Sequence, residues 1–444
     1  MEPSSLLALL MFATLLVAIL SGIQVAFALG AVGIVFGCIG HMAGVFLISD
    51  FGFVPQRIYG VMQNTTLIAV PLFIFMGITL ERSGIAADLL QSMERVFWNF
   101  RGGLPISLIL VGALLAASTG IVGATVVTMG VLSLPTIIKR GYPKELACGA
   151  IAASGTLGQI IPPSIVLILI ASMMNIAVAD LFAAALIPGG MLVALYIVFC
   201  FLKQPSAKST FKEEPNLSGK KGVLPDLLKS VLPPLSLIAI VLGTILGGMA
   251  SPTEAAACGA VGAVVLALLK RKLTTEKVRK IASQTTAITS MVFTLLIGAQ
   301  FFGVVFRGLD GEELIANFLF AFGSNQSVIL LVIMLMLFVL GFFLDFLEIC
   351  FIVIPIIAPI LVGELGINPV WLAILIAMNL QTSFLTPPFG FALFYLKGVA
   401  PAEISSLDIY RGVIPFIAIQ LGVLFLVWAF PQLALWLPAL LFPQ

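Results

Sequence analysis

The chain has 444 residues, of which 61% are hydrophobic and only 9% are charged. Because soluble domains carry roughly 25% charged residues, this composition excludes a soluble globular protein and indicates a polytopic membrane protein within a lipid bilayer. The net charge of +2, without a basic and aromatic patch, gives no indication of a nucleic-acid partner.

Apolar runs of membrane-spanning length open the first half of the chain, at about 5–20, 22–40 and 64–81. Residues Met1–Ser5 carry no cationic side chain, so we expect the first run to be a retained span and not a cleaved signal peptide. The rest of this half is predicted to comprise an amphipathic stretch at 86–100, an interrupted run at 103–138, a run at 144–175 and a run at 180–202.

A polar, lysine-rich segment at 203–229 separates the two halves and is predicted to be a linker. The elements predicted after it are spans at 230–249 and 252–270, an amphipathic stretch at 272–284, a span at 286–306, an interrupted run at 327–361, and runs at 367–397 and 413–440. Their order matches that of the first half, so we predict that residues 1–202 and 230–444 are two repeats of one plan.

A Pro-Pro pair interrupts an apolar run in each half. Pro162-Pro163 recurs as Pro387-Pro388, an offset of 225 residues (387 − 162). A prolyl nitrogen has no hydrogen to donate and its ring blocks a helical bond, so each helix must break. A broken helix persists in a membrane only against protein or a water-filled cavity, and a matched pair of breaks is typical of a transporter's binding site.

The lysine and arginine residues predict that the two repeats run in opposite directions. If 103–138 and 327–361 are re-entrant hairpins, and the 203–229 linker is cytoplasmic, then Arg57 and Arg307 alone lie outside. Of the 22 Lys and Arg residues, 22 − 2 = 20 then lie in the cytoplasm, as membrane insertion favours. This arrangement places both chain termini on the periplasmic side.

The tips of the predicted hairpins carry the first candidate residues. Ser118, Thr119 and Gly120 form a polar interruption whose oxygens suit a hard cation such as sodium, although small residues also serve helix packing. Asp345 and Glu348 lie deep in an apolar run of the second hairpin. A carboxylate in that position is costly, so a functional role is expected, the alternative being a structural carboxyl bonded to the backbone.

The broken helices carry further hydroxyl and amide side chains, and no arginine or lysine lies among them. These side chains are Ser154, Thr156 and Gln159 in the first half, and Asn379, Gln381, Thr382, Ser383 and Thr386 in the second. Half-helix N-termini attract anions, and unwound carbonyl groups coordinate cations. A carboxylate solute between two cation sites would suit this arrangement.

The sequence lacks the residues that a multi-histidine metal site, a nucleotide site or an intramembrane enzyme would need. His41 is the only histidine, the five cysteines form no close pair, and no nucleotide-binding glycine-lysine loop occurs. Asp345 is the only aspartate expected to be buried, so the pair of facing aspartates of an intramembrane enzyme cannot form. We therefore predict a protein that is not an enzyme, with no cofactor and no metal beyond a transported ion.

Several stretches together resemble one transporter family. They are Leu67–Gly77, SPTEAAA at 251–257, GQIIPPSIV at 158–166, LDFLEI at 344–349 and LTPPFGFALFYL at 385–396. The chain resembles, over essentially its whole length, the large membrane subunit of a TRAP (tripartite ATP-independent periplasmic) transporter.

The resemblance implies an all-α protein of the ion transporter superfamily, an elevator-type transporter with two inverted repeats, re-entrant hairpins and broken helices, in a bacterial inner membrane. It implies two partners, a small four-span membrane subunit and a periplasmic solute-binding protein. The implied function is sodium-coupled uptake of a small organic acid: a C4-dicarboxylate, a keto or hydroxy acid, or a sugar acid. The alternative is a stand-alone ion-coupled carboxylate symporter of the same superfamily.

The resemblance also implies roles for the candidate residues. The first ion site would comprise Ser118, Thr119, Gly120, Ser154, Gly155 and Thr156, and the second Asp345, Asn379, Gln381, Thr382 and Ser383. The substrate cavity would include Thr125, Gln159, Pro162, Pro163, Glu348, Thr386, Pro387 and Pro388. Glu348 is an additional acid relative to the family pattern, which leaves coupling to H+ open.

Overall fold

The computed structural model describes residues 2–97, 103–120, 122–203, 223–323 and 325–443. No strand occurs within these ranges. Nine helices among the described residues are long and apolar enough to cross a membrane. The predicted all-α polytopic membrane protein is therefore confirmed.

The described residues of the first half form ten α-helices and two short 3-10 helices. They are α1 (Pro3–Leu20), α2 (Val25–Met42), η1 (Ile48–Gly52), α3 (Phe53–Gln63), α4 (Thr65–Arg82), α5 (Ile85–Val96), α6 (Gly103–Thr119), α7 (Val122–Lys139), α8 (Lys144–Thr156), η3 (Leu157–Gln159), α9 (Ile165–Met174) and α10 (Val178–Leu202).

The second half follows the same order, with two π-helical segments in its hairpin. Its elements are α11 (Val223–Leu246), α12 (Pro252–Leu269), α13 (Thr275–Gly308), α14 (Gly311–Phe320), α15 (Gln326–Leu340), α16 (Phe346–Glu348), η4 (Ile349–Val353), α17 (Ile354–Ala358), η5 (Pro359–Glu364), α18 (Pro369–Leu385), α19 (Phe391–Val399), α20 (Ser406–Ala429) and α21 (Gln432–Leu441).

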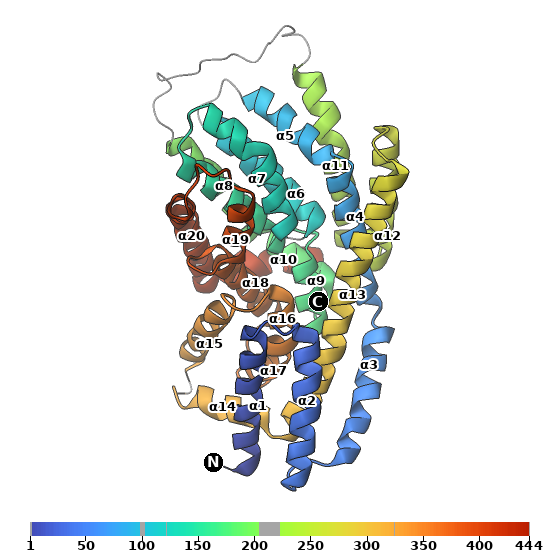
Figure 1. The fold of residues 1–444 in the computed structure, drawn as a ribbon, viewed down its shortest axis with the longest axis vertical. Coiled ribbons are helices and arrows are strands. Elements are labelled where there is room, and N and C mark those ends of the chain that lie inside the picture. Colours follow the sequence, from blue (N-terminus) through green and yellow to red (C-terminus); the bar gives the residue numbers. More distant parts are fainter. Residues whose placement is uncertain (1, 98–102, 121, 204–222, 324, 444) are drawn as a thin grey trace.

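The helices pack into two groups. In one group α2 lies along α13 and α12 lies along α4; in the other, α8 is surrounded by α6, α7 and α20 (Figure 1). Small residues allow the first group to pack closely, because a Cβ at Gly33 would approach the backbone of Phe301 to 2.9 Å. Such close backbone contact is typical of helix packing in membranes, where apolar area alone gives little driving force.

The two hairpins enter the molecule from opposite ends (Figure 1). α6 begins and α7 ends at one end, whereas α15 and the helices after it lie toward the other, and both hairpin tips are near the middle. Both broken helices are also present, with interruptions at 160–164 and 386–390. The inverted arrangement of hairpins and broken helices that the sequence predicts is therefore seen in the structure.

The structure differs from the sequence prediction at several boundaries. The stretch at 272–284 and the span at 286–306 form one helix, α13. The polar residues near Gln284 include no glycine or proline, so nothing interrupts the helical hydrogen bonds between the two parts. Conversely, the run at 413–440 is divided into α20 and α21 by a break at Pro431.

Short elements were harder to predict than long ones. Neither α3 nor α14 is among the predicted elements; each has fewer than 18 residues and so lacks the length of a span. The 203–229 linker prediction falls largely outside the described residues, and the described chain is already helical from Val223. Residues 98–100 of the predicted amphipathic stretch also lie outside the described part of the chain.

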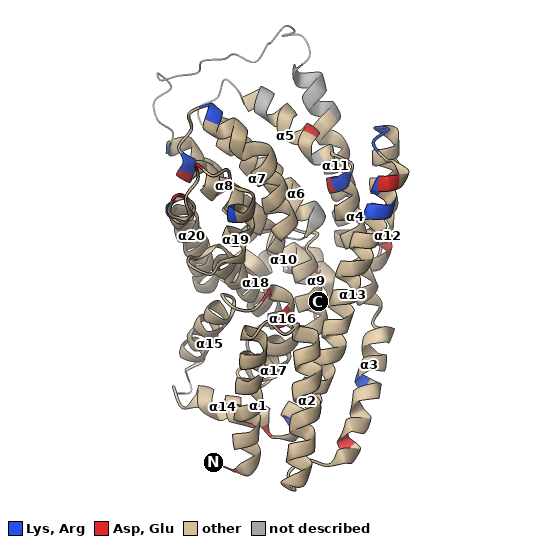
Figure 2. Cartoon of the chain, in the orientation of Figure 1, with Lys and Arg blue, Asp and Glu red and all other residues tan. Residues whose placement is uncertain are grey.

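Lysine and arginine residues gather at the end of the molecule where α7 and α12 finish (Figure 2). We predict that this end is cytoplasmic. In a variant with all five cysteines replaced, Asn325→Cys is expected to react with an impermeant maleimide in intact cells, and Lys139→Cys only after permeabilisation. Labelling of both after permeabilisation is the control. The reverse pattern in intact cells would contradict the predicted topology.

Candidate functional site

The first hairpin turns at Gly120, which adopts a φ of +62°. A Cβ there would lie 2.9 Å from the side chain of Ile165, so the tip packs against the start of α9. Ser118 and Thr119 end α6, but their side chains lie outside the described part of the structure. A positive φ and a close neighbour both favour glycine at this tip.

The α8 residues predicted for the first ion site face three different neighbours. Ser154 packs directly against Gly112 of α6, and Gly155 against Val126 of α7. Thr156 instead faces α20: its hydroxyl donates to the Ala153 carbonyl at 2.9 Å and accepts from Gln420 Nε2 at 3.4 Å. The structure therefore brings Ser154 and Gly155 to the first hairpin and turns the Thr156 side chain away from it.

The second hairpin tip is formed around two carboxylates. Asp345 Oδ1 accepts the Phe346 backbone N–H at 2.7 Å, and Glu348 Oε2 accepts the Asp345 backbone N–H at 3.0 Å. This reciprocal capping box starts α16 and orders the tip. Each of these bonds uses one carboxylate oxygen, so capping and cation binding are compatible at Asp345.

The contact between hairpin and broken helix is repeated in the two halves. Gly341, at the end of α15, packs against Ser383 of α18 as Gly112 packs against Ser154. Both partners are shifted by 229 residues, since 341 − 112 = 383 − 154 = 229. At this offset Asp345 corresponds to Ala116, so the first hairpin has no matching carboxylate.

The other predicted second-site residues lie along one buried stretch of α18. Asn379 Nδ2 donates to the Met334 carbonyl of α15 at 2.7 Å and so ties the hairpin to the broken helix. The hydroxyls of Thr382, Ser383 and Thr386 each donate to a carbonyl of the preceding turn. Their remaining lone pairs are available as oxygen ligands for a cation.

Two glutamines of the broken helices have no hydrogen-bond partner. Gln159 and Gln381 are fully buried, and neither amide atom of either side chain is bonded within the described structure. The η3 turn that carries Gln159 packs against α18, which carries Gln381. Leaving such groups unpaired costs about 1–3 kcal/mol each, so both side chains are candidates to pair with water, an ion or a solute.

Both breaks have the same local form. Pro162-Pro163 and Pro387-Pro388 each contain a cis peptide bond. In the first break the Ser164 hydroxyl donates to the Gln159 carbonyl and accepts the Leu167 N–H as the cap of α9. In the second, α19 begins after Gly390. Each break is thus followed by a new helix, α9 or α19, whose N-terminus carries backbone N–H groups without an intrahelical partner.

The second half of each broken helix packs against the hairpin of the other repeat. α9 contacts α16, η4 and α17 of the second hairpin, whereas α19 contacts α7 of the first. Neither repeat could therefore form this centre alone. The two hairpin tips and two breaks make one interleaved site.

Tyr395, on α19, lies at the first hairpin but was not among the predicted site residues. It is 43% exposed and its ring lies against Gly123, just after the first hairpin tip. A tyrosine in the apolar stretch FALFYL gives no sign of its surroundings, because tyrosine is also common at membrane interfaces.

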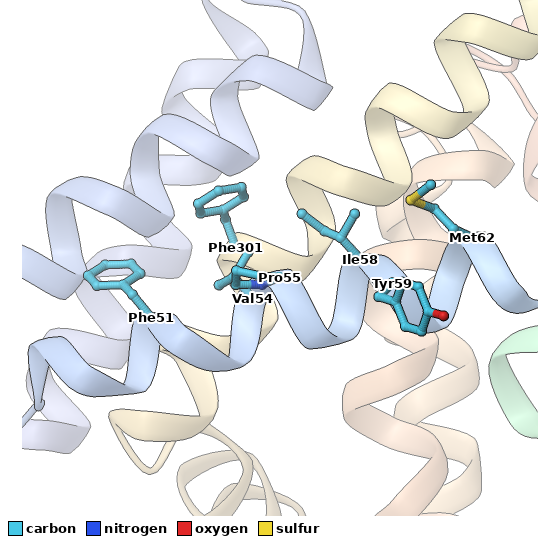
Figure 3. A pocket seen from close by; sticks show the side chains of 7 residues that line it. All are labelled: Phe51, Val54, Pro55, Ile58, Tyr59, Met62 and Phe301. Carbon is cyan, nitrogen blue, oxygen red and sulfur yellow. The ribbon is translucent and has the colours of Figure 1, made fainter.

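Two apolar cavities lie apart from the predicted site residues. One, of about 430 Å³, is a groove between α3 and α13 (Figure 3). Another, of about 620 Å³, lies between α1, α14, α15 and α17. None of the predicted site residues lines either of them. Walls with so few polar groups do not suit a charged solute.

Comparisons with known proteins agree with one another. The family described as "Tripartite ATP-independent periplasmic transporter, DctM component" matches residues 12–433. The C4-dicarboxylate TRAP transporter large permease protein DctM of Pseudomonas aeruginosa is 30% identical, with 86% of this chain and 88% of that protein covered. The sialic acid TRAP transporter large permease protein SiaM of Vibrio cholerae is 28% identical, with 95% and 96% covered.

Solved structures share the fold. The YdaH transporter of Alcanivorax borkumensis superposes with a TM-score of 0.59 at 14% identity, covering 87% of both chains. MtrF of Neisseria gonorrhoeae superposes with a TM-score of 0.58 at 13% identity, covering 86% of this chain and 84% of that one. At such low identity these likenesses concern the fold alone.

Proposed function

The chain belongs to the DctM component family of tripartite ATP-independent periplasmic transporters, and we propose that it drives sodium-coupled uptake of a small organic acid. The observation that carries this proposal is the second hairpin tip. Asp345 there starts a short helix in the middle of the molecule, while the hairpin packs on the broken helix through Gly341 and Ser383. A carboxylate among hydroxyl and carbonyl oxygens is the kind of ligand set that a hard monovalent cation needs.

The solute class follows from the polar groups of the site. No arginine or lysine lies in 151–171 or 376–396, so amides, hydroxyls, helix N-termini and the bound cation would hold the carboxylate. Relatives are named for C4-dicarboxylate, sialic acid and ectoine transport. We therefore keep the solute as a class, comprising C4-dicarboxylates, keto or hydroxy acids and sugar acids.

The proposed transporter comprises this chain, a small four-span membrane subunit and a periplasmic binding protein, in a bacterial inner membrane. In the proposed elevator mechanism, the group of helices around α8 moves as a body past the group of α2, α4, α12 and α13. Two polar contacts link the groups: Asn64 Nδ2 donates to Ser172 Oγ at 2.9 Å, and Thr128 Oγ1 donates to Glu81 Oε1 at 3.2 Å. Both would have to break during such a movement.

Reconstitution tests this function. Proteoliposomes containing the chain and its small subunit are expected to accumulate the acid only with an inward sodium gradient and only when the binding protein is added. Ligand-shift screening of the binding protein against organic acids would identify the solute. Uptake without any binding protein would instead support the stand-alone symporter, and uptake driven equally by potassium would contradict sodium coupling.

Glu348 provides a test of the role of protons. Glu348→Gln is expected to retain sodium-dependent uptake, because the amide oxygen can still accept the Asp345 N–H. Glu348→Ala is expected to lose most of it, since removing such a cap costs about 0.5–2 kcal/mol and disorders the tip. Uptake is measured at equal amounts of folded protein. If Gln is as inactive as Ala, the ionisable group itself is needed, which would favour proton coupling.

A further inference from the structure

The second half of the second broken helix carries an exposed tyrosine, Tyr395, beside buried apolar residues. On α19, Ala392, Leu393 and Leu396 are 2% exposed or less, whereas Tyr395 is 43% exposed. Within the described residues its hydroxyl makes no hydrogen bond and so remains free to bind another group. The corresponding residue of the first half, Ile170 at an offset of 225, is fully buried.

The position of the Tyr395 ring is set by the first hairpin. A Cβ at Gly123 would lie 2.9 Å from Cζ of the ring and 3.0–3.1 Å from its two Cε atoms. These are the carbons at the hydroxyl end, so that end of the phenol lies directly over the start of α7. Any residue larger than glycine at position 123 would displace it, because real Cβ atoms do not approach so closely.

The helix that carries this phenol also reaches the tip of the second hairpin. Phe391 of α19 packs on Phe384 with ring centroids 5.1 Å apart, and Phe384 meets Phe346, the residue after Asp345, at 6.3 Å. Tyr395, one turn after Phe391, therefore lies on the helix that joins the two hairpin tips, with its ring against Gly123. The nearest cationic side chain along the chain, Lys397, is bonded to the Ile404 carbonyl at 2.7 Å.

We propose that Tyr395 is a solute-binding residue whose hydroxyl donates a hydrogen bond to the carboxylate of the transported acid. The inference rests on the proposed function and adds to it the group that holds the anion. A carboxylate between the cation at Asp345 and the Tyr395 hydroxyl is paired on both sides, so the site needs no arginine or lysine. Removing a hydrogen bond to a charged group lowers affinity by roughly tenfold to a hundredfold.

The test compares Tyr395→Phe with the matched substitution Tyr59→Phe. Tyr59 is an exposed tyrosine on α3 that lines the groove between α3 and α13 (Figure 3). Uptake of ¹⁴C-labelled succinate, pyruvate and gluconate is measured in proteoliposomes containing the assembled transporter. Tyr395→Phe is expected to raise the KM for the transported acid at least about tenfold, with a smaller change in kcat, while Tyr59→Phe leaves both unchanged.

Sodium alone is the second probe. The melting temperature of the purified permease is measured in increasing NaCl, with choline chloride as the reference salt. In Tyr395→Phe, the NaCl concentration that gives half of the stabilisation is expected to stay within about twofold of the wild type, because the phenol binds the solute and not the ion. Gly123→Ala should lower uptake as Tyr395→Phe does. The double variant should be no more impaired than the more impaired of the two single variants, since both act through one contact.

The outcomes separate the two proposals. An unchanged KM in Tyr395→Phe, together with normal sodium stabilisation, overturns the role of Tyr395 and leaves the proposed function standing. A loss of sodium stabilisation in Tyr395→Phe overturns it as well, because the hydroxyl would then belong to the ion site. If the wild-type transporter takes up none of the three acids, the proposed function fails and the inference fails with it.

Discussion

Asp345→Asn is expected to reduce sodium-dependent uptake by at least about a hundredfold and to abolish the stabilisation of the purified protein by NaCl. Removing one partner from a buried ion pair costs about 3–5 kcal/mol, and asparagine keeps the side-chain size while losing the charge. Because asparagine is also a good helix N-cap, α16 should still form. Uptake in proteoliposomes and the melting temperature in NaCl against choline chloride are the two measurements.

The control for Asp345→Asn is Asp408→Asn. Asp408 is the third residue of a capping box at the exposed start of α20, where its side chain accepts the Ser405 backbone N–H at 2.8 Å, so Asp408→Asn also alters a capping carboxylate, but at an exposed helix end. Asp408→Asn is expected to leave sodium-dependent uptake within about twofold of the wild type. Normal uptake in Asp345→Asn would reject the second ion site, and the proposed sodium coupling would then lose its main support.

Gly341→Ala is expected to have the next largest effect, because the added Cβ would overlap the Ser383 hydroxyl of α18. Overpacking of this kind costs about 1–3 kcal/mol, and it would push the second hairpin away from the broken helix. We expect a lower melting temperature and a loss of most uptake. Gly112→Ala should act similarly in the first half, where the facing side chain is Ser154.

Gly363→Ala is the matched control on the same hairpin. A Cβ at Gly363 meets nothing within 4 Å, so stability and uptake should be retained. Adding Ser383→Gly to Gly341→Ala should recover the melting temperature, since it removes the side chain that the new Cβ would meet. Sodium-dependent uptake should stay low if Ser383 is an ion ligand. Recovery of both would assign Ser383 to packing alone.

The architecture was largely predictable from the sequence because it depends on local backbone chemistry. Two Pro-Pro pairs require two broken helices, and the structure has interruptions at 160–164 and 386–390. The distribution of lysine and arginine predicts two hairpins of opposite direction, and two hairpins that enter the molecule from opposite ends are present. The resemblance to the TRAP large subunit, which rested on motifs such as GQIIPPSIV, is confirmed by a family match over 12–433.

The sequence does not predict which of the candidate site side chains come together in the folded protein. Neighbours on one helix point in directions about 100° apart, so Ser154, Gly155 and Thr156 meet α6, α7 and α20 although they are adjacent in sequence. Likewise, an apolar run does not show whether it is one helix or two. Residues 275–308 form a single helix and 413–440 are divided between two, which depends on Pro431 and on the neighbours of each segment.

The class of protein, the family, the two helix breaks and the deep carboxylate pair can all be predicted from composition or from a few adjacent residues. Neither composition nor local motifs show that α9 packs on the second hairpin and α19 on the first, or that the Tyr395 ring lies against Gly123. The reason is physical: these residues are separated by tens to hundreds of positions along the chain. They meet only because the two inverted repeats pack against each other.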